Sequence, residues 1–246
     1  MLEFKDVSVR LGGQRILDGV SFSLRPGCVT ALVGRNGSGK STLLSCVDGL
    51  VPWEGQILLE GKPLRQLPPR QRSRRVAIAH QELPAPRISG RELVSFGREP
   101  YLDLTGRLRE ADRRAVEEAL RAVEAEDLAL RRVDTLSGGE RQRLFLAMLL
   151  AQQTPLLLLD EPTAHLDLGW QAELLRLLAE LEGKTVLAVL HDIGLAVRYA
   201  EELLVLEEGR LVFAGSREEC LRQQVLEKTF RLRRYSVDGR DFFAPD

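Results

Sequence analysis

Cysteine, aromatic residues and long apolar runs are all scarce in this sequence. Only three of its 246 residues are cysteines, and 5% are aromatic. The cysteines are odd in number and widely spaced, without the spacing of a metal site, which favours reduced thiols over a disulfide framework. No window approaches the roughly 18 consecutive apolar residues of a membrane-spanning helix, so none is predicted. The cysteines are Cys28, Cys46 and Cys220.

Neither sign of charge dominates. The 35 lysines and arginines are balanced by 36 aspartates and glutamates, so the formal net charge is −1. With so small a net charge, the chain has no overall positive electrostatic field that would attract a polyanion. No nucleic-acid partner is therefore expected. The one basic run, RQLPPRQRSRR at 65–75, is typical of a solvated helix face. The first residues, MLEFKDVSVR, alternate like a strand and lack the apolar segment of a signal peptide, so a cytoplasmic location is expected.

The pattern of apolar residues divides the chain into three regions. Residues 1–81 hold short alternating segments between Gly-rich turn signals, which predict strands. Residues 82–135 begin with a Pro- and Gly-punctuated loop and continue with charged, helically spaced residues, which predict a small helical region. From 136 onward, apolar strand candidates at 156–160 and 185–191 alternate with helical stretches. This alternation predicts an α/β fold with a parallel sheet covered by helices.

The most informative segment is GRNGSGKST at 34–42. A short apolar run, VTALV, precedes it as a predicted strand, and STLLSCVDGL follows as a predicted helix. Its glycines allow a tight turn with N–H groups pointing inward, and the helix N-terminus adds its own unpaired N–H groups. Lys40 can reach the β and γ phosphates of a nucleotide, and the Ser41 hydroxyl can ligate Mg²⁺. The predicted phosphate cradle is Gly34, Arg35, Asn36, Gly37, Ser38, Gly39, Lys40, Ser41 and Thr42.

A pair of carboxylates follows the apolar run LLLLD. Asp160 and Glu161 lie where a strand buried on both faces would emerge at its C-terminal end. Mg²⁺ on a triphosphate would meet Asp160, and Glu161 would be free to orient a water on the γ phosphate. On its own, an acidic pair before a proline is also an ordinary strand exit. The phosphate loop favours the catalytic interpretation.

A second Gly-rich motif, LSGGERQR at 136–143, lies at the start of a predicted helix. It forms a second potential anion site through Ser137, Gly138 and Gly139. With this motif the sequence resembles the ATP-binding cassette (ABC) family, whose members carry a phosphate loop, a signature LSGGQ, a carboxylate strand and a switch histidine in this order. The resemblance covers essentially the whole chain. Glu140 stands where glutamine is commoner, a substitution that we expect to be tolerated.

The resemblance implies one P-loop NTPase nucleotide-binding domain over 1–246. In this arrangement a RecA-like core with an N-terminal antiparallel β subdomain covers about 1–81 and 136–246. A helical subdomain covers 82–135, and the signature helix from 137 is attached to it. The resemblance also implies ATP and Mg²⁺ as cofactors. It implies a homodimer in which each copy presents its signature to the nucleotide held by the other.

The family's catalytic and metal positions carry over to individual residues. Ser41 and Asp160 match metal-associated groups. Gln81 matches a glutamine that touches the metal region and senses the transporter partner. Glu161 matches the catalytic carboxylate and His191 the γ-phosphate switch histidine. A lone histidine after an apolar strand is otherwise more often structural, and only its spacing from the carboxylate strand favours the switch role.

Two further positions concern the dimer and the base. Asp167 matches the D-loop of the family, which lies between the two copies. Leu11 stands at the position of the aromatic residue that usually stacks on adenine, so we expect adenine to rest on an aliphatic side chain. Because stacking contributes on the order of 1 kcal/mol, this change bears on base selectivity.

The chain holds one cassette, so as part of a transporter it must dock on separate membrane subunits. The segments VSFGREPYLDLTGRL and LFLAMLLAQQTP are similar to the ATPases of iron-siderophore, haem and cobalamin importers. This predicts an ATP-hydrolysing subunit, peripheral on the inner face of the membrane, with permease subunits as partners. A periplasmic or lipoprotein substrate-binding protein would be an indirect partner. The alternatives are a soluble ABC ATPase, such as one for iron–sulfur assembly, or a different transported substrate.

Overall fold

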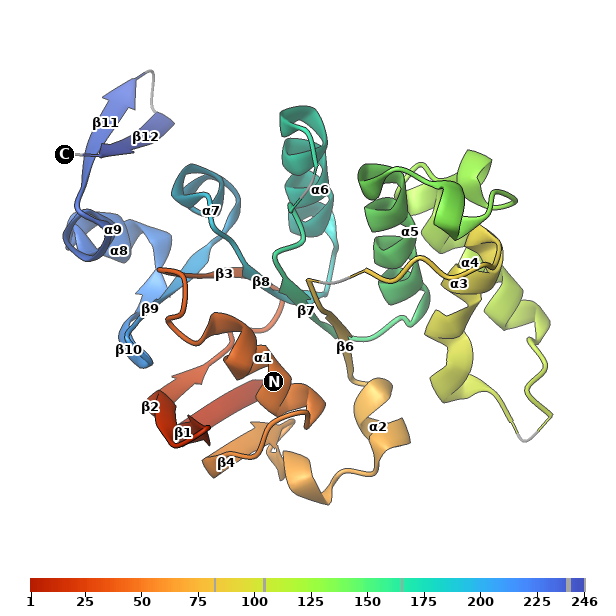
Figure 1. Ribbon diagram of the computed structural model, residues 1–246, viewed down its shortest axis with the longest axis horizontal. Helices are drawn as coiled ribbons and strands as arrows, with labels where there is room; N and C mark the ends of the chain where they lie inside the picture. Colours follow the sequence, from red (N-terminus) through yellow and green to blue (C-terminus); the bar gives the residue numbers. More distant parts are fainter. Residues whose placement is uncertain (82, 104, 165, 238–239, 246) are drawn as a thin grey trace.

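The computed structural model describes residues 1–81, 83–103, 105–164, 166–237 and 240–245. Its centre is a six-stranded sheet of order β10-β9-β3-β8-β7-β6, in which all neighbours are parallel except β9 and β10 (Figure 1). The inner strands are apolar runs buried on both faces, as helices and a second sheet cover them. The strands are β3 (Val29–Gly34), β6 (Val76–Ala79), β7 (Leu156–Asp160), β8 (Thr185–Val189), β9 (Glu202–Glu207) and β10 (Arg210–Ser216).

A four-stranded antiparallel sheet of order β2-β1-β4-β5 lies below the central sheet in Figure 1. Helix α1 (Lys40–Asp48) packs between the two sheets through buried apolar residues such as Leu43 and Leu44. Phe4 and Phe22 stack across β1 and β2 with ring centroids 4.6 Å apart. One apolar cluster therefore joins this sheet, α1 and one face of the central sheet. The strands are β1 (Leu2–Leu11), β2 (Gln14–Ser23), β4 (Glu54–Leu59) and β5 (Lys62–Pro63).

A group of helices forms the right side of the molecule in Figure 1. Leu93, Leu120 and Leu144 are buried where α3, α4 and α5 pack on one another. Helix α5 also contacts β6, so the helix that begins with the signature motif joins this group to the central sheet. The elements are α3 (Gly90–Ser95), η2 (Phe96–Tyr101), α4 (Glu110–Ala122), η3 (Glu126–Leu128), η4 (Val133–Thr135) and α5 (Gly138–Ala151).

Helices α6 and α7 cover the other face of the central sheet and α8 and α9 lie at its far end, while η1 and α2 pack beside β4 and β6 (Figure 1). A two-stranded hairpin, β11 (Leu232–Val237) and β12 (Arg240–Pro245), packs against α7 at the end of the molecule opposite the helical group (Figure 1). In the described part of the chain no helix is long and apolar enough to cross a membrane. The helices are η1 (Leu64–Gln66), α2 (Pro69–Ser73), α6 (Leu168–Glu180), α7 (Ile193–Tyr199), α8 (Arg217–Arg222) and α9 (Val225–Phe230).

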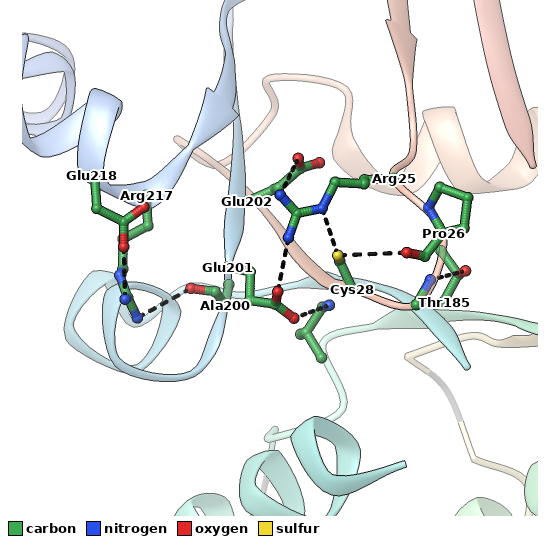
Figure 2. Close-up of polar contacts among 11 residues, drawn as sticks. Arg25, Pro26, Cys28, Thr185, Ala200, Glu201, Glu202, Arg217 and Glu218 are labelled. Carbon is green, nitrogen blue, oxygen red and sulfur yellow. Dashed lines mark hydrogen bonds and ion pairs between the residues drawn. The ribbon is translucent and has the colours of Figure 1, made fainter. Parts of the chain in front are cut away.

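The loop that leads into β3 is held by polar contacts to β8 and β9 (Figure 2). Arg25 pairs with Glu201 at 2.9 Å and with Glu202 at 3.7 Å, and its Nε donates to Cys28 Sγ at 2.7 Å. The amide of Gly27 donates to Thr185 Oγ1. All three cysteines are free and buried, and burial raises the pKa of Cys46 and Cys220 to about 12. Cys46 and Cys220 therefore pack as small apolar groups, whereas Cys28 takes part in the polar contacts of this loop.

The basic run at 65–75 does more than face solvent. Two short helices, the end of η1 and the five-residue α2, form within it. Arg70 and Arg74 donate to the backbone carbonyl of Pro100, each at 2.9 Å, and Arg70 also donates to Leu102. Both arginines are exposed, as expected for a solvated helix face, and they also bond to the backbone at the end of η2, against which α2 packs. Their bonds go to this chain's own backbone.

One buried ion pair lies inside the helical group. Arg98 Nε donates to Asp112 Oδ1 at 3.0 Å, and the two side chains are only 6% and 7% exposed. Arg98 also donates to Ala151 O at 2.6 Å and lies over the Tyr101 ring at 4.1 Å. The pair links η2, α4 and the end of α5. Its charges are compensated only while both partners are present.

We predict that Asp112→Ala lowers the free energy of unfolding by about 3–5 kcal/mol, because it leaves the Arg98 guanidinium buried without a counter-charge. Urea unfolding followed by circular dichroism measures the loss. Glu110→Ala, on the same helix, is the control, because Glu110 and Arg113 form an exposed pair at 3.8 Å. The decrease in the free energy of unfolding should be several times smaller for Glu110→Ala than for Asp112→Ala. Equal losses in the two variants would show that the buried pair contributes no more than an exposed one.

Candidate active site

The phosphate loop connects β3 to α1, and its glycines are required by close contacts. A Cβ on Gly34 would lie 2.4 Å from Leu206 O and 2.5 Å from Ser38 Oγ. At Gly39 the backbone has φ +102°, and a Cβ would lie 2.6 Å from Leu17. Gly37, at φ +78°, is also in the left-handed region that favours glycine. The turn therefore forms as the spacing of glycines predicts.

The loop holds a lysine ammonium group and a buried hydroxyl group that can bind an anion. Lys40 Nζ donates to Gly34 O at 2.8 Å and to Arg35 O at 3.1 Å, so its ammonium group lies folded over the loop. Burial lowers the pKa of Lys40, and Glu161 and Asp160 partly offset this. Ser38 Oγ is buried and has no hydrogen-bond partner among the described residues. With the N-terminus of α1, these groups suit a phosphate.

Ser41 and Asp160 bring two oxygens together at the start of α1. Ser41 Oγ donates to Asp160 Oδ1 at 3.1 Å. Asp160 is 5% exposed, and burial raises the pKa of its carboxyl group. Among the described residues no cluster of three or more His, Cys, Asp or Glu side chains could hold a metal alone. The arrangement fits Mg²⁺, which binds through one or two protein ligands and completes its shell with substrate phosphates and water.

Glu161 is contacted by side chains from two neighbouring strand ends. Gln81 Nε2, just after β6, donates to Glu161 Oε2 at 2.8 Å. His191, just after β8, forms a hydrogen bond through Nε2 to Glu161 Oε1. A carboxylate only accepts, so the ring donates through Nε2. Three residues that are far apart in the sequence therefore meet beside the phosphate loop.

An open cleft is lined by these groups together. Ile16, on β2, lines it beside the phosphate loop, although the sequence suggested Leu11 for the adenine contact. Leu11 is 39% exposed at the end of β1, paired with Gln14 next to the turn of the hairpin, and is not among the described lining residues. A spacing argument could not identify Ile16, because its place depends on how β2 packs on Gly39. The lining residues are Ile16, Asn36, Gly37, Gly39, Lys40, Ser41, Thr42, Gln81, Glu161 and His191.

The signature residues do not line this cleft. Ser137 caps α5, and Glu140 accepts from its N–H at 2.8 Å and from its hydroxyl at 2.9 Å. Ser137 and Gly138 are exposed at the first turn of the helix, with Gly139 half-buried. Asp167 caps α6 by accepting from Trp170 N at 3.0 Å. Fold and site together define a P-loop nucleotide-binding domain with a second, exposed helix N-terminus outside its own cleft.

Comparison with known proteins identifies the family. The family model described as ABC transporter matches residues 17–164. A probable siderophore transport system ATP-binding protein of Bacillus subtilis is 40% identical, and the match covers 92% of this chain and 84% of that protein. The ferric enterobactin transport ATP-binding protein of Escherichia coli is 38% identical, with coverage of 96% and 89%.

A solved structure gives the same result. A dimeric bacterial ABC transporter cassette has a TM-score of 0.78 and 27% sequence identity, and the match covers 88% of this chain and 98% of that one. The chain belongs to the ABC transporter family. It has the α/β fold of the family's cassettes, and its enzymatic activity is ATP hydrolysis.

We predict that Asp160→Asn raises the melting temperature of the nucleotide-free protein at neutral pH, by about 2–4 °C for each kcal/mol gained. The amide can still accept from Ser41, while the desolvated charge is removed. The pKa of Asp160 is raised on folding, so wild-type stability falls as the pH rises through the folded pKa. The advantage of the variant should therefore shrink as the pH is lowered below that pKa.

Differential scanning fluorimetry over a pH series measures this effect. Asp103→Asn is the control of opposite sign, because contacts with Thr105 and Arg109 lower the pKa of Asp103 to about 2. Loss of its charge should lower the melting temperature. A decrease in melting temperature for Asp160→Asn as well would contradict the view that the carboxylate is destabilised by burial.

Proposed function

We propose that this chain is the ATP-hydrolysing subunit of an importer for a metal chelate of the iron-siderophore, haem or cobalamin type. The observation that carries the proposal is the similarity over 92% and 96% of the chain to ATP-binding proteins of siderophore and ferric enterobactin transport. A cobalamin import ATP-binding protein of Halobacterium salinarum is also 40% identical. The substrate would be selected by other subunits, and this chain would supply the free energy of ATP hydrolysis.

The proposed active unit is a homodimer with two shared ATP sites. Each cleft would hold one ATP, and the exposed Ser137, Gly138 and Gly139 of the second copy would close over its γ phosphate. Asp167 would lie at the contact between the copies. The separation of cleft and signature within one chain supports this arrangement, as does the dimeric state of a solved relative. ATP binding would thus favour the closed dimer, and hydrolysis would remove the bridging phosphate.

The roles of the cleft residues follow from their positions. The loop from Gly34 to Thr42 would wrap the phosphates, with Lys40 moving from the loop carbonyls to the β and γ oxygens. Ser41, Asp160 and Gln81 would hold Mg²⁺, which neutralises phosphate charge when bound. Adenine would lie toward β1 and β2, where Leu11 and Ile16 offer aliphatic surface.

Glu161 is the proposed general base. Its carboxylate can orient a water in line with the γ phosphate and accept a proton from it. His191 and Gln81 contact the two oxygens of this carboxylate, so both would hold its orientation, and His191 would also sense the γ phosphate. These polar groups would be in position before the reaction begins. Little reorganisation of the site would then be needed to stabilise the charge of the transition state.

The partners would be two integral-membrane permease subunits, with a periplasmic or lipoprotein substrate-binding protein acting indirectly. The chain would lie on the inner face of the membrane, docked through the helical group and the segment after Gln81. The domain division proposed from the sequence, with a helical subdomain over 82–135 and the signature helix attached to it, suits this docking. The packing of α5 on both α3 and β6 supports such a link.

We predict that Glu161→Gln retains ATP binding, forms a more stable dimer with ATP, and loses turnover by several orders of magnitude, since the amide cannot accept the proton. ATPase assays and size-exclusion chromatography with ATP measure these effects. Lys40→Ala serves as a contrast, because it should weaken ATP binding itself. Undiminished hydrolysis in the Glu161→Gln variant would refute the assignment.

The transport role predicts that deletion of the gene abolishes uptake of at least one labelled substrate among a ferric siderophore, haem and cobalamin. Complementation with the wild-type chain should restore this uptake, and complementation with Glu161→Gln should not. The wild-type chain should also co-purify with a polytopic membrane protein. Normal uptake of all three substrates, with co-purification of soluble partners only, would favour a soluble ABC ATPase instead.

A further inference from the structure

The backbone at Glu161 has an unusual conformation. Its φ is +52°, in the left-handed region that residues with a side chain rarely adopt. The N–H of Ala164 donates to Glu161 O at 3.0 Å and closes a turn directly after β7. This turn aims the carboxylate at Gln81 and His191 instead of letting it continue along the strand. A strained conformation of this kind persists only where surrounding contacts hold it.

One such contact comes from the signature helix. Gln142 Nε2 donates to the carbonyl oxygen of Pro162 at 2.9 Å. Proline has no N–H, so its carbonyl is the one backbone group through which residue 162 can be held by a hydrogen bond. Gln142 lies in the second turn of α5, three residues after Gly139. The bond therefore joins the helix that begins with the signature to the Pro162–Thr163 peptide, one residue after Glu161.

Gln142 is half-buried, and its bond to Pro162 is partly shielded from solvent. Gln142 lines a small cavity between α5 and α6, where leucines such as Leu146 and Leu174 lie beside the charged residues Glu124, Arg143 and Glu173. A polar group that loses its partner in such a place recovers only part of the lost hydrogen bonding from water. The next residue, Arg143, lies over the Trp170 ring at 4.3 Å and fixes α5 against α6. The amide of Gln142 is thus held in position.

We propose that Gln142 is a positioning residue for Glu161. This proposal rests on the proposed role of Glu161 as the general base. Gln81 and His191 hold the carboxylate, and Gln142 holds the backbone that aims it. In the proposed dimer the same helix contacts the nucleotide of the partner through its first turn. One rigid helix therefore connects the γ phosphate in one ATP site to the carboxylate that serves the other site.

The test is Gln142→Met in the full-length protein, which keeps length and packing but removes the donor. The expected result is a fall in kcat on the order of 10²-fold, since a misplaced base costs about this much, with KM for ATP changed by less than about twofold. Gln142→Lys restores an N–H donor and should recover part of kcat. Gln142→Glu places a carboxylate against the Pro162 carbonyl and should lose at least as much as Gln142→Met.

A matched control separates positioning from general packing. Gln152, at the other end of α5, donates through its side chain to the carbonyls of Ser73 and Val76. Gln152→Met removes a comparable amide contact from the same helix, and its kcat should stay near that of the wild type. Equal losses of kcat in Gln142→Met and Gln152→Met, or no recovery with Gln142→Lys, would overturn the proposal.

Glu161→Gln, measured in parallel, distinguishes the two levels of inference. Wild-type kcat in Gln142→Met together with an inactive Glu161→Gln would overturn the role of Gln142 and leave that of Glu161 intact. Wild-type kcat in Glu161→Gln would overturn the general base, and with it the positioning role. Loss of kcat in both, with ATP affinity retained in both, is the result that supports the proposal.

Discussion

The register of the parallel strands is the constraint on which the site depends. Ala79 pairs with Leu159 across β6 and β7, and Asp160 pairs with Val189 across β7 and β8. Gln81, Glu161 and His191 each lie one or two positions after a paired residue of their strand. A shift of one strand by a single residue would reverse its side chains and separate them. The apolar core that fixes this register is therefore as much a part of the active site as the polar groups.

The same core makes the site electrostatically incomplete without its ligand. Lys40 and Asp160 are both buried enough that their pKa values move toward the neutral forms. Ser38 Oγ has no partner among the described residues, and Lys40 bonds only to carbonyls of its own loop. A magnesium–nucleotide complex supplies the charges that would compensate these groups. Stability and ligand affinity are thus opposed at these positions, a common property of functional sites.

Much of this arrangement could be predicted from the sequence, because it depends on local rules. The turn at Gly34–Gly39 follows from the spacing of glycines, and the buried strand before Asp160 follows from a run of leucines. Three other features could not be predicted in this way. They are the place of Ile16 in the cleft, the bonds of Arg70 and Arg74 to η2, and the left-handed turn at Glu161. Each depends on how elements that are distant in sequence pack together, which no local pattern records.

The arginine contacts between α2 and η2 have a consequence for how the attachment of the helical group responds to salt. Arg70 and Arg74 donate to backbone carbonyls, whereas the neighbouring Arg75 forms an ion pair with Glu60. A carbonyl carries no net charge, so dissolved salt screens such a bond less than it screens an ion pair. The carbonyls also belong to the backbone, so they persist through any change of side chain at residue 102. The contact between α2 and η2 is therefore kept at salt concentrations that weaken the Arg75–Glu60 pair.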